Sequence, residues 1–105
     1  MTEYNIVLCT VNTRDLANNI AKSLISEKLA ACVNISDNIT SIYSWDDKIV
    51  EDSEILLIIK SKKNLFPKVE AKIKQLHTYD VPEIISIDIQ DGSNDYLKWL
   101  NQSVQ

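Results

Sequence analysis

The sequence predicts an α+β domain of the ferredoxin-like βαββαβ type, with a long hairpin between its second and third strands and a C-terminal helix. Apolar residues follow strand and helix periodicities in that order along the chain. The stretch from Ala30 to Lys62 predicts one continuous β-hairpin. A single glycine and two prolines among 105 residues favour long regular elements with few turns. We expect residues 1–105 to form one domain.

The first strand and helix are predicted between residues 5 and 28. The run from Asn5 to Val11 is apolar on both faces, which is typical of a central strand covered on both sides. Asn12 or Thr13 can cap the following helix, and Asp15 suits its positive N-terminal end. Lys28 marks the predicted end of this helix. Its apolar face consists of Leu16, Ala17, Ile20, Ala21 and Leu24.

The hairpin is expected to be longer than the domain that carries it. Its arms run from about Cys32 to Trp45 and from about Lys48 to Ser61, with Asp46-Asp47 at the turn. Each arm of about 14 residues would span about 45 Å, whereas a domain of this length has a diameter of about 35 Å. The outer apolar side chains then have nothing local to cover them, and exposed apolar strands favour association. These side chains are Ile39, Ile42, Tyr43, Trp45 and Ile49.

Two polar runs interrupt the apolar pattern of the hairpin. Ser36-Asp37-Asn38 in the first arm and Glu51-Asp52-Ser53 in the second are interpreted as bulges or bends. The run from Ile55 to Ile59 follows them and has the composition of a fully buried strand.

The second helix and the fourth strand are predicted after residue 63. Asn64 can cap the helix, and Pro67 falls in its first turn, where a missing N–H costs nothing. Val81-Pro82 ends any helix and starts a strand. The helix buries Leu65, Val69, Ile73 and Leu76, and the strand places Ile85, Ile87 and Ile89 on one face and Ile84, Ser86 and Asp88 on the other.

A short last helix completes the chain. Asp91-Gly92 is a turn signal, and Ser93 is expected to cap a helix that carries Tyr96 and Trp99. A plait with two apolar sheet faces and only two long helices leaves one face uncovered. This is a second argument for self-association, and it does not depend on the length of the hairpin.

Composition narrows the class of partner and the compartment. The chain carries 11 Lys and Arg against 15 Asp and Glu, and the formal net charge of −4 disfavours nucleic acid and anionic membranes as partners. No apolar run reaches the ~18 residues of a membrane span. The start at Met1 leads directly into a strand, so we expect no signal peptide and a cytoplasmic location. Cys9 and Cys32 are expected to be reduced core thiols.

Five separated motifs in this order resemble the CutA divalent-cation tolerance family across essentially the whole chain. The resemblance implies a ferredoxin-like homotrimer with an architecture similar to that of PII signalling proteins, in which long hairpins wrap neighbouring subunits. It implies a link to metal tolerance, copper especially, and no agreed catalytic activity. The motifs are Leu29-Ala30-Ala31-Cys32-Val33-Asn34-Ile35, Ser41-Ile42-Tyr43 with Trp45, Glu54 with Lys60, His77-Thr78-Tyr79-Asp80-Val81-Pro82-Glu83-Ile84, and Gly92 with Tyr96-Leu97-Lys98-Trp99-Leu100.

The chain departs from the family pattern at two positions. Thr78 stands where the family usually has proline, and Asp47 stands where the hairpin turn often has glycine. Aspartate adopts a left-handed turn conformation less readily than glycine, so we expect a wider turn here.

Cys9 and His77 are the candidate metal ligands that the resemblance implies, with copper or another divalent metal as the ligand and no required cofactor. Cys9 is also consistent with a small packed hydrophobe in a buried strand, which is the interpretation that its position between Leu8 and Thr10 favours. His77, the only histidine, is consistent with a helix-terminal residue that caps carbonyls. Met1 lies at a terminus that we expect to be mobile. A closed zinc site needs four N or S ligands, so two candidates predict weak binding at most.

Lys60, Tyr79 and Glu83 form a second candidate constellation. Lys60 and Glu83 are consistent with an ion pair between subunits. Alternatively, the three residues line a small-ligand cleft between subunits. Tyr43, Trp45 and Glu54 are the candidate trimer interface, with Trp45 and Glu54 supplied by a neighbour.

Three functional readings remain open at this point. The first is a non-enzymatic homotrimer of divalent-metal tolerance. The second is a PII-like adaptor that binds a small ligand, and the third is a scaffold for a partner protein. The sequence has no H-E-x-x-H, no Ser/His/Asp order and no Gly-rich phosphate loop, so we do not expect an enzyme.

Overall fold

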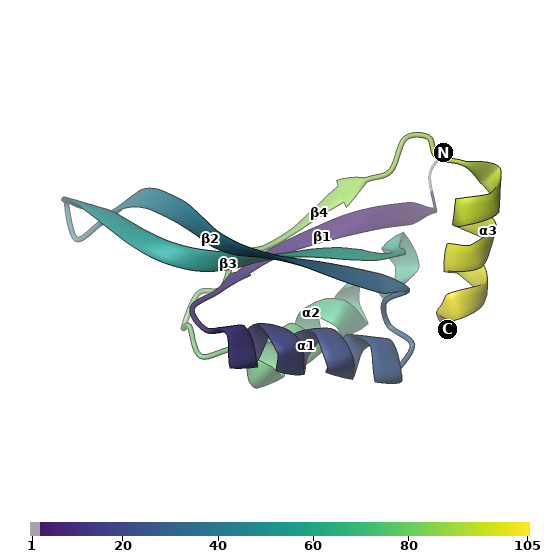
Figure 1. Cartoon of the computed structure of the whole chain (residues 1–105), viewed down its shortest axis with the longest axis horizontal. Helices are drawn as coiled ribbons and strands as arrows, with labels where there is room; N and C mark the ends of the chain where they lie inside the picture. Colours follow the sequence, from purple (N-terminus) through teal and green to yellow (C-terminus); the bar gives the residue numbers. More distant parts are fainter. Residues whose placement is uncertain (1–2) are drawn as a thin grey trace.

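A four-stranded antiparallel sheet in the order β2-β3-β1-β4 forms the centre of the protein, and α1 and α2 cover one of its faces (Figure 1). This confirms the predicted ferredoxin-like class. The computed structural model describes residues 3–105, so Met1 lies outside the described residues. The elements are β1 (Tyr4–Val11), α1 (Arg14–Ser26), β2 (Cys32–Trp45), β3 (Lys48–Lys62), the 3₁₀ turn η1 (Lys63–Leu65), α2 (Phe66–Leu76), β4 (Ile84–Asp88) and α3 (Asn94–Ser103).

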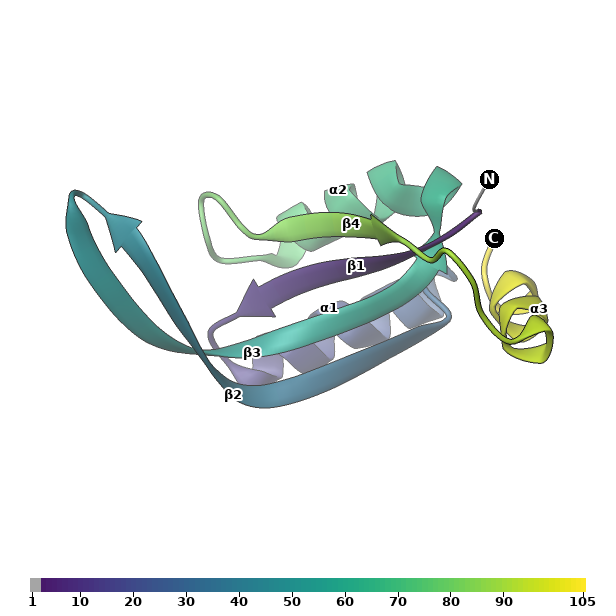
Figure 2. The ribbon, with the colours of Figure 1, turned by 90° about the horizontal axis from the view of Figure 1, so that it is seen from above.

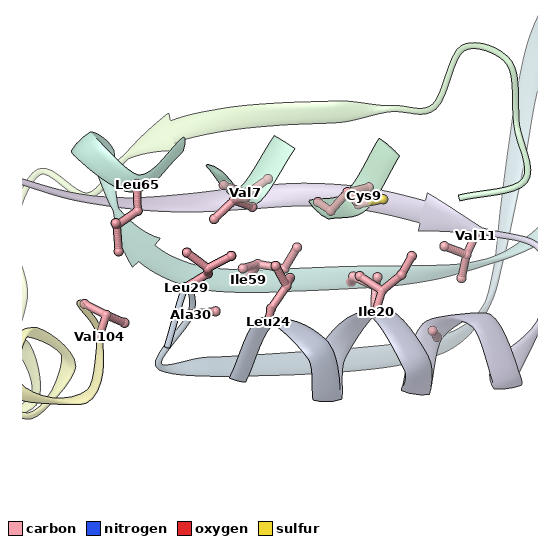
Figure 3. Packing of buried hydrophobic residues seen from close by; sticks show 14 residues of the cluster. Val7, Cys9, Val11, Ile20, Leu24, Leu29, Ala30, Ile59, Leu65 and Val104 are labelled. Carbon is pink, nitrogen blue, oxygen red and sulfur yellow. The ribbon is translucent and has the colours of Figure 1, made fainter. Parts of the chain in front are cut away.

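The hydrophobic core lies between the sheet and the two helices (Figure 3). Every second residue of β1 points into it, and the same alternation in β3 contributes Leu57 and Ile59. The face of α1 predicted from its spacing supplies Ile20 and Leu24, both fully buried. Burial of each such aliphatic side chain contributes about 1.5–3 kcal/mol. The β1 residues in the core are Val7, Cys9 and Val11.

The hairpin extends past the rest of the sheet, as predicted. Its arms contain 14 and 15 residues, and the molecule measures 45 × 26 × 23 Å along its principal axes. Figure 1 shows the far end of β2 and β3 projecting away from β1 and β4. Beyond Ile55, which pairs with Val11, the described strands β2 and β3 pair only with each other. We call residues 39–54 the outer hairpin.

The connection at the tip is tighter than expected. Trp45 pairs with Lys48, so only Asp46 and Asp47 form the turn. Their φ angles are 52° and 59°. Two successive left-handed residues match the twist of a two-residue hairpin turn, and aspartate tolerates that conformation better than most residues. The expectation of a wider turn at Asp47 is therefore wrong.

One of the two predicted bulges is present. The register shifts between Ser36 and Ile39, where Asp37 and Asn38 oppose a single residue of β3 and Asn38 has a φ of 57°. The bulge predicted at residues 51–53 is wrong, because β3 pairs continuously with β2 from Glu54 to Lys48. Those polar residues lie in the exposed outer hairpin, where solvent explains their polarity.

The start of α1 is as predicted, but its end is not. The Thr13 hydroxyl oxygen accepts the Leu16 N–H at 3.1 Å, which makes Thr13 the cap. The helix ends at Ser26. Lys28, the predicted last residue, has a φ of 58° and lies beyond the helix, where a left-handed residue commonly turns the chain.

The caps predicted for the other helices fail in detail. Asn64 lies within η1 and does not cap α2, because an extra 3₁₀ turn moves the start of the helix to Phe66. Pro67 does lie in the first turn, as expected. Ser93 occupies the position before α3, but its side chain makes no capping hydrogen bond.

The second face of the sheet is apolar and open, as predicted. Figure 2 looks onto this face, with α1 and α2 behind the sheet. In residues 3–105 no helix crosses it, and Ile85 and Ile87 are 49% and 48% exposed. Ile89 lies just past the end of β4. The register places on this open face Ile6, Leu8, Leu56, Ile58, Ile85 and Ile87.

Candidate functional site at the root of the hairpin

The loop between α2 and β4 meets the hairpin where the hairpin leaves the sheet. The Tyr79 hydroxyl donates a 2.8 Å hydrogen bond to Glu54 Oε2. Glu54 is only 8% exposed and pairs with Ile39, the first residue after the bulge. We call this place, made of Asp37, Asn38, Ile39 and Glu54, the hairpin root. Burying a carboxylate without a partner destabilises the folded state. The hydrogen bond from Tyr79 offsets part of that desolvation free energy.

His77 contacts Tyr79 through a hydrogen bond and through ring packing. The Tyr79 N–H donates to His77 Nδ1 at 3.1 Å, so the ring proton resides on Nε2, which donates to the Thr10 carbonyl at 2.8 Å. The two aromatic rings also pack together, with centroids 4.6 Å apart. His77 is the C-cap of α2, and its own N–H bonds the Ile73 carbonyl. The predicted helix-terminal position of His77 is confirmed, and both of its ring nitrogens are engaged.

Cys9 lies on the core side of β1 and is fully buried. Burial, together with the nearby carboxylates of Glu83 and Glu54, raises the pKa of its thiol to about 12. The thiol is therefore protonated at neutral pH, whereas metals bind the thiolate.

The candidate metal ligands do not present ready donors within one subunit. The Cys9 thiol is protonated and buried, and both nitrogens of His77 hold hydrogen bonds. Across residues 3–105, no group of three or more His, Cys, Asp or Glu side chains is placed to hold a metal ion. A metal bound by this pair must displace a hydrogen bond and a proton, so the donor set fits a tight resident metal poorly.

The second constellation is split along the sheet. Lys60 pairs with Ile6 and Cys32 near the end of the sheet that is remote from the hairpin tip, whereas Glu83 precedes Ile84 beside Cys9. Ile6 also pairs with Ile87, so Lys60 lies level with Ile87 in the sheet. Ile87 is four residues after Glu83, and this separates Lys60 from Glu83 by about 13 Å along the strand direction. Tyr79 and Glu83 therefore lie near the hairpin root, and Lys60 lies farther along the sheet, away from the hairpin tip.

The three predicted interface residues occupy different parts of the hairpin. Tyr43 and Trp45 are 41% and 61% exposed in the outer hairpin, and Glu54 is buried at the root. The Tyr43 hydroxyl donates to the Asp52 carboxylate, and this hydrogen bond raises the Tyr43 pKa. The sequence analysis placed Asp52 only in a predicted bulge, because its diagonal contact with Tyr43 across the strands follows from the register.

One further contact at the hairpin root could not be predicted from the sequence. Arg14, the first residue of α1, places Nη1 2.7 Å from both carboxylate oxygens of Asp37 in the bulge. No local pattern relates two residues 23 positions apart. Only the packing of α1 against β2 brings them together.

The fold and this site define a ferredoxin-like α+β protein of the long-hairpin type. A family profile described as CutA1 divalent ion tolerance protein matches residues 5–103, so the chain belongs to the CutA1 family. The divalent-cation tolerance protein CutA of Thermus thermophilus is 47% identical over 98 residues, covering 93% of this chain and 95% of that protein. The CutA1 structure from Oryza sativa superposes with a TM-score of 0.96 at 42% identity, covering 99% of this chain and 95% of that one.

Some relatives are longer than this chain. The chloroplastic CutA of Arabidopsis thaliana is 44% identical over 100 residues, which cover 95% of this chain but only 55% of that protein. None of the helices in the described part of the chain is both long and apolar enough to traverse a membrane.

Proposed function

We propose that the protein is a non-enzymatic homotrimer that acts in divalent metal ion tolerance. The observation that carries the proposal is the open apolar face of the sheet, where Ile85 and Ile87 are half exposed. An uncovered aliphatic face of this kind is stabilised when a second copy covers it. Membership of the CutA1 family supports the metal-tolerance role.

The outer hairpin supports the same assembly. It carries Ile42, Trp45 and Ile49, which are 65%, 61% and 85% exposed. A projecting hairpin that reaches a neighbour makes a head-to-tail interface, and such interfaces close into rings when the rotation permits. Tyr43 and Trp45 of one subunit would then lie against a neighbouring subunit, near the Glu54 at the hairpin root of that neighbour.

Metal binding in this proposal is weak and uses Cys9 and His77. Binding of Cu⁺ or a divalent ion there would release the thiol proton and one hydrogen bond of His77. In this proposal the metal is a transient ligand, and the protein is stable without it. We place this activity in the cytoplasm.

Two measurements test the proposal. Sedimentation velocity over a micromolar concentration range should give one species with three times the subunit mass, and a stable monomer would refute the assembly. Calorimetric titration with Cu⁺, Cu²⁺ and Zn²⁺ should give weak binding that a Cys9→Ser/His77→Ala double variant loses. Identical titrations of the two proteins would show that this metal site is wrong.

A small-ligand cleft between subunits is the second candidate function. The favouring observation is that Lys60 and Glu83 are separated by about 13 Å along the sheet of one subunit and do not pair with each other, so head-to-tail packing can place one subunit's Lys60 near another's Glu83 and Tyr79. Such a cleft suits a small anion with a hydroxyl or carboxyl group. In a thermal-shift screen of nucleotides and carboxylates, stabilisation that persists in Lys60→Ala and Glu83→Gln would exclude this lining.

A further inference from the structure

The outer hairpin is a two-stranded ribbon that other parts of its own subunit must hold in place. Beyond Ile55 the described strands β2 and β3 lose β1 as a partner. An isolated two-stranded ribbon is marginally stable and twists freely, and a bulge adds a local bend. Its direction relative to the body therefore depends on contacts at the root.

Two side-chain contacts meet the root from outside the hairpin, one on each arm. Arg14 of α1 holds Asp37 in the bulge of β2, with both oxygens 2.7 Å from Nη1. Tyr79 of the α2–β4 loop holds Glu54 of β3 at 2.8 Å. Figure 2 shows this loop near the end of β1, at the end of the sheet from which the hairpin projects.

The Tyr79 contact is itself supported by the core. His77 accepts the Tyr79 N–H and donates to the Thr10 carbonyl, so a chain of hydrogen bonds runs from β1 through His77 and Tyr79 to Glu54. Thr10 is buried, and β1 is the central strand that pairs on both sides. These hydrogen bonds thus connect Glu54 of the hairpin to the central strand of the sheet.

We infer that these contacts form a two-sided brace, made of Arg14–Asp37 and Tyr79–Glu54, which fixes the direction of the outer hairpin before subunits meet. The inference rests on the proposed assembly, because its benefit is a hairpin already oriented for a neighbour. Preorganisation of this kind raises the fraction of subunits that are competent to associate. The part-buried Tyr79–Glu54 contact is the stronger of the two, since both members of the Arg14–Asp37 pair are 52% exposed and water screens them.

The brace predicts a specific kinetic defect. The Arg14→Gln/Tyr79→Phe double variant should associate about 10-fold more slowly than wild type, because losing a hydrogen bond to a charged group lowers the oriented fraction by about that factor. Refolding from guanidinium, followed by tryptophan fluorescence at several protein concentrations, separates the concentration-dependent association step from the concentration-independent folding step. The folding step should be unchanged.

Matched controls separate the brace from a general loss of contacts. Lys63→Gln removes another exposed ion pair, in which Lys63 Nζ lies 3.2 Å from Asp88 Oδ2. This control should associate at the wild-type rate. Glu54→Gln keeps an acceptor for Tyr79 and should retain most of the rate, whereas Glu54→Leu should behave like Tyr79→Phe.

The outcomes distinguish failure of the brace from failure of the assembly. If the double variant associates as fast as wild type, the brace is refuted and the trimer stands. If wild type proves monomeric, the trimer is refuted, and residual dipolar couplings of the monomer test the brace directly. Couplings of residues 39–54 should then be averaged in the double variant only, and equal couplings in both proteins would overturn the inference.

Discussion

The hydroxyl of Tyr79 lies 2.8 Å from the carboxylate of Glu54 and joins the loop after α2 to the strand that carries the hairpin outward. Loss of water around the phenol raises the pKa of Tyr79, and the hydrogen bond to Glu54 raises the pKa further. This contact links residues that sequence reasoning had assigned to different roles, Tyr79 to a ligand cleft and Glu54 to a subunit interface.

The Tyr79 contact predicts a loss of stability in alkali. Because the pKa of Tyr79 is higher in the folded state than the ordinary value of 10.0, its contribution is fully present below pH 10 and is lost as pH rises above that value. The free energy of unfolding should therefore fall more steeply above pH 10 in wild type than in Tyr79→Phe. Denaturant titrations from pH 8 to pH 11 measure the difference, with Tyr4→Phe as the control. Parallel curves for wild type and Tyr79→Phe would contradict the prediction.

The buried thiol of Cys9 should be unreactive in the folded protein. Its pKa of about 12 leaves almost no thiolate at pH 8, and its side chain is fully buried. A short iodoacetamide pulse followed by mass spectrometry should label the half-buried Cys32 well before Cys9. In Cys32→Ser, which retains only Cys9, labelling should wait for unfolding. Rapid labelling of Cys9 in that variant would show that the strand opens locally.

The open face of the sheet predicts an asymmetry between two exposed isoleucines. Ile87 on the open face is 48% exposed, and Ile25 on α1 is 42% exposed. Ile87→Asp should dissociate the assembly, because a buried unpaired carboxylate costs several kcal/mol per interface. Ile25→Asp should leave it intact and change stability by less than about 1 kcal/mol. Sedimentation velocity of both variants checks this, and equal behaviour would place the interface elsewhere.

The turn of the hairpin predicts a stabilising substitution. Asp47 has a φ of 59°, a conformation that glycine adopts without the steric cost of a side chain. Asp47→Gly should raise the free energy of unfolding by up to about 1 kcal/mol. Ser53→Gly, within the straight part of β3, should lower it. Thermal denaturation of the pair provides the test, and a destabilised Asp47→Gly would mean that the aspartate side chain makes a contact of its own.

Most of the fold could be predicted because it depends on local patterns. The central position of β1 follows from its two apolar faces, and the helix faces follow from their spacing. The predicted end of α1 and the Asn64 cap were wrong because helix ends depend on short-range alternatives of similar energy, such as the 3₁₀ turn before α2. The bulge at residues 51–53 was wrong because polar residues in a projecting ribbon look the same as an interruption of a strand.

The candidate site could be predicted only in part. His77, Tyr79, Glu54 and Cys9 were singled out as residues, but their connection was not foreseen. The hydrogen bond between Tyr79 and Glu54 spans 25 positions, and that between His77 and Thr10 spans 67. Lys60, which was grouped with Tyr79 and Glu83, lies toward the other end of the sheet.

The sequence by itself determined the class of fold, the length of the hairpin, the bare apolar face and the family, because each of these is written in periodicity or in contiguous motifs. The tertiary structure alone decided that Cys9 is a protonated core thiol, that both nitrogens of His77 are engaged, and that Arg14 and Tyr79 meet the two arms of the hairpin. The physical reason is that burial, protonation and long-range hydrogen bonds depend on which segments become neighbours. That outcome is set by the register beyond the bulge and by the packing of α1 and the α2–β4 loop against the sheet.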